Sequence, residues 1–468
     1  MPIDNNTNHK PHLDSIVWAV NVGGDAYESS DGVDYLADDF DLGGEIAHMA
    51  TVVGSQDNTL YQSYRMGDLK MSHAIPNGTY DLQFRFAEPF DIPVGDRVFN
   101  VLAQGEPVIE DLDVRLARDG RHVSALDRVV TGIVVNDGRL DITFKASAGD
   151  PILNALVVRR QMKDSRLWKL VWSDEFDQDG APDDTRWSTD VWPARKVNDE
   201  EQAYTARPEN VRVEDGHLIL EAHKEDYDNA AYTSGRIHSQ GKGDILYGKV
   251  DVRAKLPAGQ GSWPAIWMLP SDPYKYSTSC GEDEEWQGSP TCDAWPNSGE
   301  IDIMEHVGYD MNNVHGTVHN KAAYWIHWNQ RKGSIEGKTV AKEFHVYSVE
   351  WTPDEITVSM DGSPYFTYVN EGTGWEAWPY DHPFHLVLNL AVGGMWGRAG
   401  GPVDTTIFPI RLEIDYVRVL NRVLPEDIRV PAGKLVGWTV HKPPWVRPAK
   451  KRRRRRWIRA RSRWARLG

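Results

Sequence analysis

The sequence predicts an all-β protein built from two sandwich domains. Its 468 residues exceed the roughly 250 to 300 at which a single hydrophobic core stops growing. Short runs in which apolar and polar residues alternate recur along the chain, separated by turns rich in Gly, Asn, Asp and Pro. No long amphipathic helical pattern interrupts these runs. Two β-sandwiches, each with its own core, are therefore expected.

The first domain is expected over residues 15–162, where the runs include IVWAVNV, TYDLQFRFAE and LDITFKA. A short charged stretch at residues 161–166 marks the candidate boundary. The second domain is expected over residues 167–421, with runs such as HLILEA, GKVDVRAKL and RLEIDYVRVL. This length is sufficient for two many-stranded sheets packed face to face.

Residues 422–468 differ from both domains, because they are first rich in proline and then strongly basic. From Lys442 onward the sequence has thirteen Lys or Arg residues and no acid. Like charges at this density repel one another, so a disordered tail is expected. Such a tail could contact an anionic surface or nucleic acid, and a cloning or reading-frame accident explains it equally well. No function is assigned to it.

Charge and composition favour a neutral sugar ligand. The net charge of −17 argues against nucleic acid as a partner of the folded domains. The 19 tryptophans offer flat faces on which sugar rings stack, although tryptophans also fill the cores of β-sandwiches. A glycan-binding protein that acts as a monomer is therefore expected.

Cys280 and Cys292 are the only cysteines, and both lie in one loop rich in Gly, Asp and Pro. Their separation permits a local disulfide, with two free thiols as the alternative. A disulfide would suit a secreted, periplasmic or cell-surface protein. No apolar run reaches the ~18 residues of a membrane span, and the first residues, MPIDNNTNHKPH, lack the apolar core of a signal peptide.

The segment GEIDIMEH at residues 299–306 carries the candidate chemistry. Glu300 and Asp302 alternate with isoleucines, so one face of a strand is acidic while the other enters the core. Strict alternation would send Glu305 to the core side. One extra residue in a β-bulge near Met304 returns Glu305 to the acidic face, and bulges are frequent beside active sites.

The spacing of these acids predicts paired-carboxylate chemistry. With the bulge, Glu300 and Glu305 are about 13 Å apart along the strand, and side chains leaning together by about 4 Å each bring their carboxyls to about 5 Å. This separation is typical of a retaining glycosidase. Asp302 would share a proton with Glu300 and help to keep Glu305 protonated. The alternative is a solvated acidic strand, which places like charges side by side at a cost.

Several ordered motifs surround this segment: GSWPAIWMLP at 261–270, GEIDIMEHVG at 299–308, GTVH at 316–319, then LNLAVGG and IDYVRV. Together they resemble family 16 glycoside hydrolases, and among them the bacterial laminarinases, over nearly all of residues 167–420. The resemblance implies a β-jelly-roll, or concanavalin-like sandwich, with a concave cleft. It also implies a retaining endo-β-1,3-glucanase that cuts β-glucan by double displacement without a cofactor. The alternatives are a mixed-linkage β-1,3-1,4-glucan or a marine galactan as substrate, or a non-catalytic glycan-binding protein.

The resemblance also implies roles for individual residues. For His319 the alternative is a surface imidazole, and for Trp267 a core position. Asn210 and Arg236 could instead brace a loop. The implied set comprises the catalytic residues, with Glu300 as nucleophile, Asp302 as assisting carboxylate and Glu305 as acid/base, and the substrate-binding Trp263, Trp267, Asn210, Arg236, His319 and Trp396.

A structural calcium ion is a further implication of the resemblance. The matching positions are the side chains of Asp415 and Glu175 and the carbonyl of Gly216. Oxygen ligands suit this hard cation. The alternative is an Asp415 that is hydrogen-bonded within the protein and holds no ion.

The first domain resembles malectin domains through the stretches AVNVGGDAYESSDGVDYLADD, LYQSYRMGD, NGTYDLQFRFAE and GDPILNALVV. Malectin domains are sugar-binding β-sandwiches, so the resemblance implies an accessory carbohydrate site with Tyr61, Phe90 and Asp150 as contacts. The sequence departs from the pattern at Pro89, where an aromatic precedes Phe90 in malectin, and at Met66. A structural or domain-docking role is the alternative.

Overall fold

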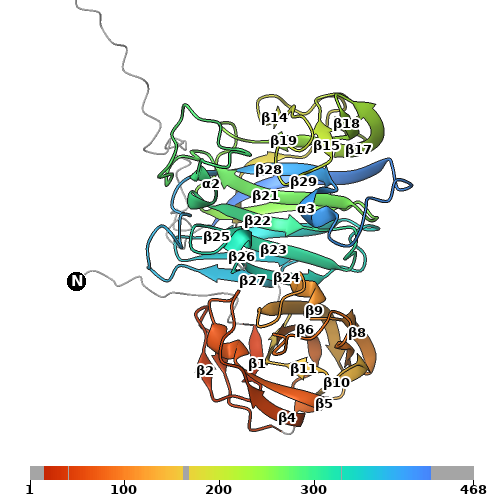
Figure 1. Ribbon diagram of the computed structural model, residues 1–468, viewed down its shortest axis with the longest axis vertical. Helices are drawn as coiled ribbons and strands as arrows, with labels where there is room; N and C mark the ends of the chain where they lie inside the picture. Colours follow the sequence, from red (N-terminus) through yellow and green to blue (C-terminus); the bar gives the residue numbers. More distant parts are fainter. Residues whose placement is uncertain (1–14, 41, 162–167, 328, 423–468) are drawn as a thin grey trace, which may run out of the picture. The chain divides into compact units, whose positions relative to one another are not determined.

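The computed structural model describes residues 15–40, 42–161, 168–327 and 329–422. Strands dominate these residues (Figure 1), so the predicted all-β class is confirmed. The helical elements within the same ranges are single short turns. The expected boundary at residues 162–166 and the basic tail from 423 onward lie outside the described residues.

The N-terminal sandwich follows the alternation that predicted it. In β10 the side chains of Leu140, Ile142 and Phe144 are buried, and most of those between and beyond them are exposed. Its first layer, in spatial order, is β1 (Ile16–Asn21), β12 (Ala155–Arg160), β6 (Gly78–Phe86) and β9 (Leu126–Val135). Its second layer is β11 (Ile152–Leu153), β5 (Ser63–Ala74), β10 (Arg139–Ala148), β7 (Val98–Ala103) and β8 (Glu106–Leu112), with β4 (Gly43–His48) beside β5. The smaller elements are β2 (Tyr27–Glu28), β3 (Asp34–Tyr35), and the 3-10 turns η1 (Asn58–Tyr61) and η2 (Leu116–Arg118).

The C-terminal sandwich has a large apolar core between its two layers. One layer, part of which is visible as parallel bands in Figure 1, is β24 (Arg331–Glu336), β23 (Asn313–His319), β22 (Glu300–Glu305), β21 (Ser262–Pro270), β28 (Phe384–Val392), β19 (Arg236–His238) and β14 (Ser188–Thr189). The other layer is β15 (Gln202–Tyr204), β18 (Ala230–Ser234), β17 (His217–Tyr227), β29 (Ile410–Arg422), β20 (Gly248–Lys255), β25 (His345–Trp351), β26 (Glu355–Met360) and β27 (Ser363–Val369). The remaining elements are β13 (Trp168–Asp174) on β29, β16 (Val211–Glu214) on β17, α2 (Ala294–Asn297), α3 (Gly394–Gly397) and η3 (Trp325–His327).

The two sandwiches share one sheet. Strand β9 of the first lies beside β24 of the second, with Val129 paired to Ile335 in parallel orientation. Val129 is also part of the apolar core of the C-terminal sandwich. The Ser334 hydroxyl on β24 donates a hydrogen bond to the Asp127 carbonyl at 2.7 Å. The sheet that carries the candidate acids therefore continues into the N-terminal sandwich.

Strand β22 contains the predicted bulge. Opposite β21, Met304 pairs with Ile266 and Asp302 pairs with Trp267, which leaves Ile303 as the extra residue. The register with β23 shifts in the same segment. The side chains of Ile303 and Met304 are both fully buried. Two consecutive residues thus face the core, and the alternation restarts one residue later.

Candidate active site

The bulge places three acids on one face of β22. Glu300, Asp302 and Glu305 all line a cleft of about 520 Å³ on this layer, while Ile301 and Ile303 are fully buried. The common acidic face expected from the alternation and the bulge is therefore what the structure contains.

Each of the two glutamates accepts a hydrogen bond from an indole. Trp295 donates its Nε1 proton to Glu300 Oε2 at 2.9 Å, and Trp263 donates to Glu305 Oε1 at 3.1 Å. His319 on β23 lies opposite Glu300, with its Nε2 3.7 Å from Glu300 Oε1 and 3.4 Å from Asp302 Oδ2. These contacts fix the direction in which each carboxylate points.

Burial makes these acids hold protons more tightly than acids in water. Burial, and next the charge of Glu305, raises the pKa of Glu300 to about 8. Burial raises the pKa of Glu305 to about 7. The pKa of Asp302 lies well above its usual range because of burial and the two glutamates. The cluster therefore retains protons at neutral pH and titrates as a coupled set.

Hydrogen bonding determines which member of the Glu300–Asp302 pair is ionised. Their mutual hydrogen bond lowers the pKa of Glu300 and raises that of Asp302, as expected when the proton sits on Asp302 and is donated to Glu300. The Trp295 indole and the Arg236 cation also lower the pKa of Glu300. Burial lowers the pKa of His319 to about 3, so its imidazole is neutral. These neighbours therefore favour the charged form of Glu300, whereas burial and Glu305 favour its protonated form and leave its pKa at about 8, above that of Glu305.

Aromatic side chains form much of the cleft wall. Arg236 lies between two of them, with its guanidinium 4.5 Å from the ring centre of Trp192 and 4.9 Å from that of Trp267. Its Nε donates to Asp190 Oδ2 at 2.8 Å, and the Trp267 indole donates to Asn389 Oδ1 at 2.7 Å. Flat, fixed indole faces suit the apolar faces of sugar rings. The tryptophans that line the cleft are Trp192, Trp263, Trp267, Trp286, Trp295, Trp325 and Trp396.

The predicted substrate contacts are not all in the cleft. Arg236 and His319 line it, as do the three tryptophans expected there. Asn210 does not: it is fully buried, and its amide donates to the Glu221 carbonyl and to Thr233 Oγ1, each at 3.0 Å. Asn210 thus braces the segment before β16, as in the alternative, and the prediction that it contacts substrate is wrong. Asn389 supplies an amide within the cleft.

Several cleft residues were not predicted, among them Trp295, Asn389 and Lys332. Trp295 lies in the loop before β22, where the sequence gives no periodic pattern. Asn389 could have been predicted from the sequence, because it is the single amide side chain within the wholly buried strand β28. Lys332 on β24 faces the cleft near Glu305 and lowers the pKa of that glutamate. Burial, with the nearby Arg118, lowers the pKa of Lys332 to about 8.

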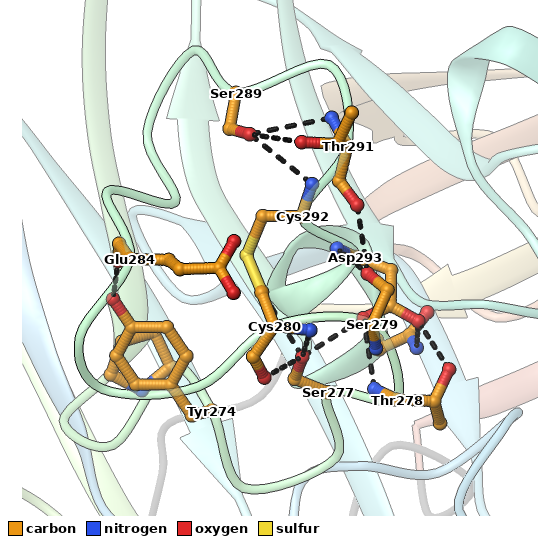
Figure 2. Close-up of a disulfide and its surroundings, with 12 residues drawn as sticks. Tyr274, Ser277, Thr278, Ser279, Cys280, Glu284, Ser289, Thr291, Cys292 and Asp293 are labelled. Atoms are coloured by element: carbon orange, nitrogen blue, oxygen red, sulfur yellow. Dashed lines mark hydrogen bonds between the residues drawn. A yellow bond between two sulfur atoms is a disulfide. The ribbon is translucent and has the colours of Figure 1, made fainter.

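A disulfide holds the loop that forms one wall of the cleft (Figure 2). Cys280 and Cys292 are bonded, with their Cα atoms 5.1 Å apart, so the favoured interpretation is confirmed and that of free thiols is wrong. Below the bridge, the carboxylate of Asp293 accepts the backbone N–H groups of Thr278 and Ser279 at 2.8 and 2.9 Å. The loop closed by the disulfide contains Trp286, which lines the cleft.

The positions expected to hold calcium are occupied by ion pairs. The Asp415 carboxylate accepts a hydrogen bond from Arg253, and Glu175 accepts two from Arg418, at 2.7 and 3.0 Å. Gly216 takes a positive φ of 75° in the turn between β16 and β17. Because each carboxylate is neutralised by a guanidinium, this arrangement does not fit a bound calcium ion.

The expected sugar contacts of the N-terminal domain are split between two places. Phe90 is 43% exposed and lies 5.9 Å from the Arg97 guanidinium, which also donates to the carbonyl of Asp150. Tyr61 is only 1% exposed, and its hydroxyl donates to Asp127. Tyr61 is thus a core residue whose hydroxyl is held by Asp127. Its ring is not exposed beside Phe90, so the two residues do not form one sugar-binding surface.

A pair of buried glutamates in a cleft walled by tryptophan is the arrangement of a glycoside hydrolase. The model of glycosyl hydrolases family 16 matches residues 198–418, and that of the malectin domain matches residues 16–158. A beta-glucanase of Rhodothermus marinus is 48% identical over 262 residues, which are 55% of this chain and 86% of that protein. The chain belongs to glycosyl hydrolases family 16.

Two further comparisons describe the range of relatives. The crystal structure of the laminarinase from Rhodothermus marinus superimposes with a TM-score of 0.50 at 46% identity, covering 56% of this chain and 100% of that chain. A keratan-sulfate endo-1,4-beta-galactosidase of Sphingobacterium multivorum is 33% identical over 306 residues, covering 63% of this chain and 64% of that protein. Among the described residues, no helix has the length and apolar character needed to cross a membrane.

Replacing Lys332 with Met should extend activity to higher pH. The acid/base Glu305 must be protonated, and the Lys332 cation lowers its pKa. Removing the cation raises that pKa, so the alkaline limb of the kcat/KM profile should move upward from about pH 7. Lys224→Met, an exposed change on β17, serves as the matched control. An unchanged limb in Lys332→Met would contradict the electrostatic role.

The Cys280→Ser/Cys292→Ser double variant should lose both stability and affinity. Opening a loop of this length costs about 2 to 3 kcal/mol in the free energy of unfolding. The KM for substrate should rise severalfold because the wall carrying Trp286 loosens, whereas kcat should change less. Thermal melts and initial rates measure these effects, and the unsubstituted protein treated with reductant should behave in the same way. If the double variant and the unsubstituted protein had the same KM, the cleft wall would not depend on the disulfide.

Added calcium should leave the melting temperature unchanged within about a degree. A ligand that binds only the folded state at 100 times its Kd would add about 2.7 kcal/mol of stability. The Asp415–Arg253 and Glu175–Arg418 pairs oppose such binding. Melts in millimolar calcium and in chelator test this expectation, and a calcium-dependent rise of several degrees would restore the predicted site.

Proposed function

We propose that this chain is a retaining endo-β-1,3-glucanase of the laminarinase type, acting on β-glucan polysaccharide. The observation that carries the proposal is the pair Glu300 and Glu305 on one face of β22, each oriented by an indole donor. A carboxylate pair in one cleft suits glycoside hydrolysis, and we infer double displacement from membership of family 16. Relatives named beta-glucanase and laminarinase support the substrate class.

The proposed reaction gives each glutamate one role. Glu300 attacks the anomeric carbon while Glu305 gives its proton to the leaving oxygen, and the bond between that carbon and oxygen breaks. Glu305, now ionised, takes a proton from water, whose oxygen displaces Glu300 from the sugar. Trp295 and the protonated Asp302 hold the Glu300 carboxylate in position for both steps. These steps need no cofactor beyond the chain's own carboxyl groups.

The charges in the cleft support a neutral substrate. Arg236 forms an ion pair with Asp190. The negative charges of Asp119 and Glu305 act on Lys332 and partly offset the lowering of its pKa by burial. A sulfated polymer would require cationic groups that are free to bind sulfate. Mixed-linkage β-1,3-1,4-glucan or a galactan is the second candidate, and the galactosidase relative bears only on the galactan. Retention of both glutamates argues against a non-catalytic glycan-binding protein.

The remaining features of the proposal concern the whole chain. We assign residues 15–162 to the malectin-like domain and 167–421 to the catalytic domain, and propose a monomer whose folded domains do not bind nucleic acid. The disulfide supports a secreted, periplasmic or cell-surface location. For the malectin-like domain, the burial of Tyr61 favours a docking role over an independent disaccharide site.

Substitution of either glutamate should lower turnover, and for Glu305 the factor should depend on the leaving group of the substrate. Glu300→Ala should reduce turnover of laminarin and of a dinitrophenyl laminaribioside by at least about 10³-fold, because no nucleophile remains. Glu305→Ala should lose a similar factor on laminarin but far less on the dinitrophenyl substrate, whose leaving group needs no proton. Reducing-end assays and dinitrophenol release give the rates.

Thermal melts control for folding, since neither change removes core packing. Substantial turnover of both substrates by purified Glu300→Ala would contradict the nucleophile assignment. If the unsubstituted protein left laminarin intact and cut lichenan or agarose, the substrate proposal would be wrong and the catalytic assignment would stand.

A further inference from the structure

The cleft does not end at the edge of the catalytic sandwich. Asp119, which follows η2 in the N-terminal domain, lines the cleft together with Glu305, Lys332 and Trp396. An adjoining hollow is lined by residues of both domains and again includes Asp119, Lys332 and Trp396. The cleft therefore opens onto the surface of the N-terminal domain.

Contacts between the domains hold Asp119 at this position. Arg128 on β9 donates a hydrogen bond to Ser334 on β24 and lies 3.9 Å from the carboxylate of Asp310. Arg128 is 5% exposed and Ser334 is 2% exposed. Because these polar groups are buried against one another, separating the domains would leave them without partners. These buried contacts join the N-terminal domain to the catalytic sandwich at this end of the cleft.

The same end of the cleft faces the acid/base. Glu305 pairs in register with His315, whose ring lies 5.2 Å from the ring of Trp396. The Lys332 ammonium lies 5.9 Å from the centre of the Trp396 ring. Across the sheet in the other direction, β19 carries Arg236, whose charge acts on Glu300. Since Glu305 protonates the leaving oxygen, the end with Lys332 receives the sugar that departs.

The three side chains have the chemistry of a sugar subsite. Trp396 offers a ring face, Lys332 offers donors and Asp119 offers acceptors for hydroxyl groups. The opposed charges of Asp119 and Lys332 suit a neutral sugar, and the carboxylate would repel a sulfate. We propose that Asp119 of the N-terminal domain completes, with Lys332 and Trp396, a subsite for the neutral glucan unit on the leaving-group side of the scissile bond. This inference rests on the proposed function.

The test separates substrates that fill this subsite from substrates that do not. Asp119 has a φ of 57°, so Asp119→Gly removes the side chain without backbone strain. Asp215→Gly is the matched control, because this exposed Asp has a φ of 53° in the turn between β16 and β17. Both full-length variants are assayed with laminarihexaose and with an aryl laminaribioside, whose leaving group is not a sugar.

We expect Asp119→Gly to lower kcat/KM for laminarihexaose about tenfold, as for one lost hydrogen bond to a charged group. Its kcat/KM for the aryl substrate should stay within twofold of that of the control. Transfer of the glycosyl group to added laminaribiose, which must bind on the leaving-group side, should also fall relative to hydrolysis.

Equal rates of Asp119→Gly and Asp215→Gly on both substrates would overturn the subsite. Equal losses on both substrates would also overturn it, because they would indicate an effect on the fold. An unsubstituted protein that fails to cut laminarihexaose while it cleaves another glycan would contradict the glucanase assignment itself, which is a different result from either of these.

Discussion

The active cleft depends on one extra residue in strand β22. Without the bulge at Ile303, alternation would turn Glu305 into the apolar core, where an unpaired carboxylate is strongly unfavourable. With it, Ile303 and Met304 both fill the core and Glu305 returns to the face of Glu300. The bulge thus places both glutamates on the same face of the strand. β-bulges are common beside active sites.

Burial of the acids sets the second constraint. Three carboxyl groups in a partly dry cleft cannot all be ionised, because each charge raises the pKa of its neighbours. The indole of Trp295 and the hydrogen bond with Asp302 stabilise the charge on Glu300, while the indole of Trp263 and the Lys332 cation stabilise the charge on Glu305. Glu305 keeps its proton because it is buried, and Lys332 limits how tightly that proton is held. Each glutamate thus has its own indole donor and its own nearby cation, Arg236 for Glu300 and Lys332 for Glu305.

The sequence predicted those features that depend on nearby residues. Alternation and the one-residue offset gave the shared face of Glu300 and Glu305, and local spacing gave the disulfide. The side chains of Asn210, Tyr61 and Asp415, which were expected to bind sugar or calcium, are each engaged by other residues of the protein, for a common reason. Their partners lie on strands distant in the sequence, at Thr233, Asp127 and Arg253, so position alone did not reveal that each side chain was already engaged. Asp119 was missed because only the pairing of β9 with β24 brings it to the cleft.

The shared sheet changes what an accessory domain can do. A sugar-binding domain on a flexible linker raises the local concentration of polymer but leaves the subsites of the enzyme unchanged. Here Val129 packs in the catalytic core and Arg128 is buried against Ser334, so the N-terminal domain moves with the cleft. Tyr61 has its hydroxyl bound to Asp127, the residue whose carbonyl accepts the Ser334 hydrogen bond. A side chain expected to bind sugar thus supports the domain junction, and the region that would have been a separate binding module becomes one end of the substrate cleft.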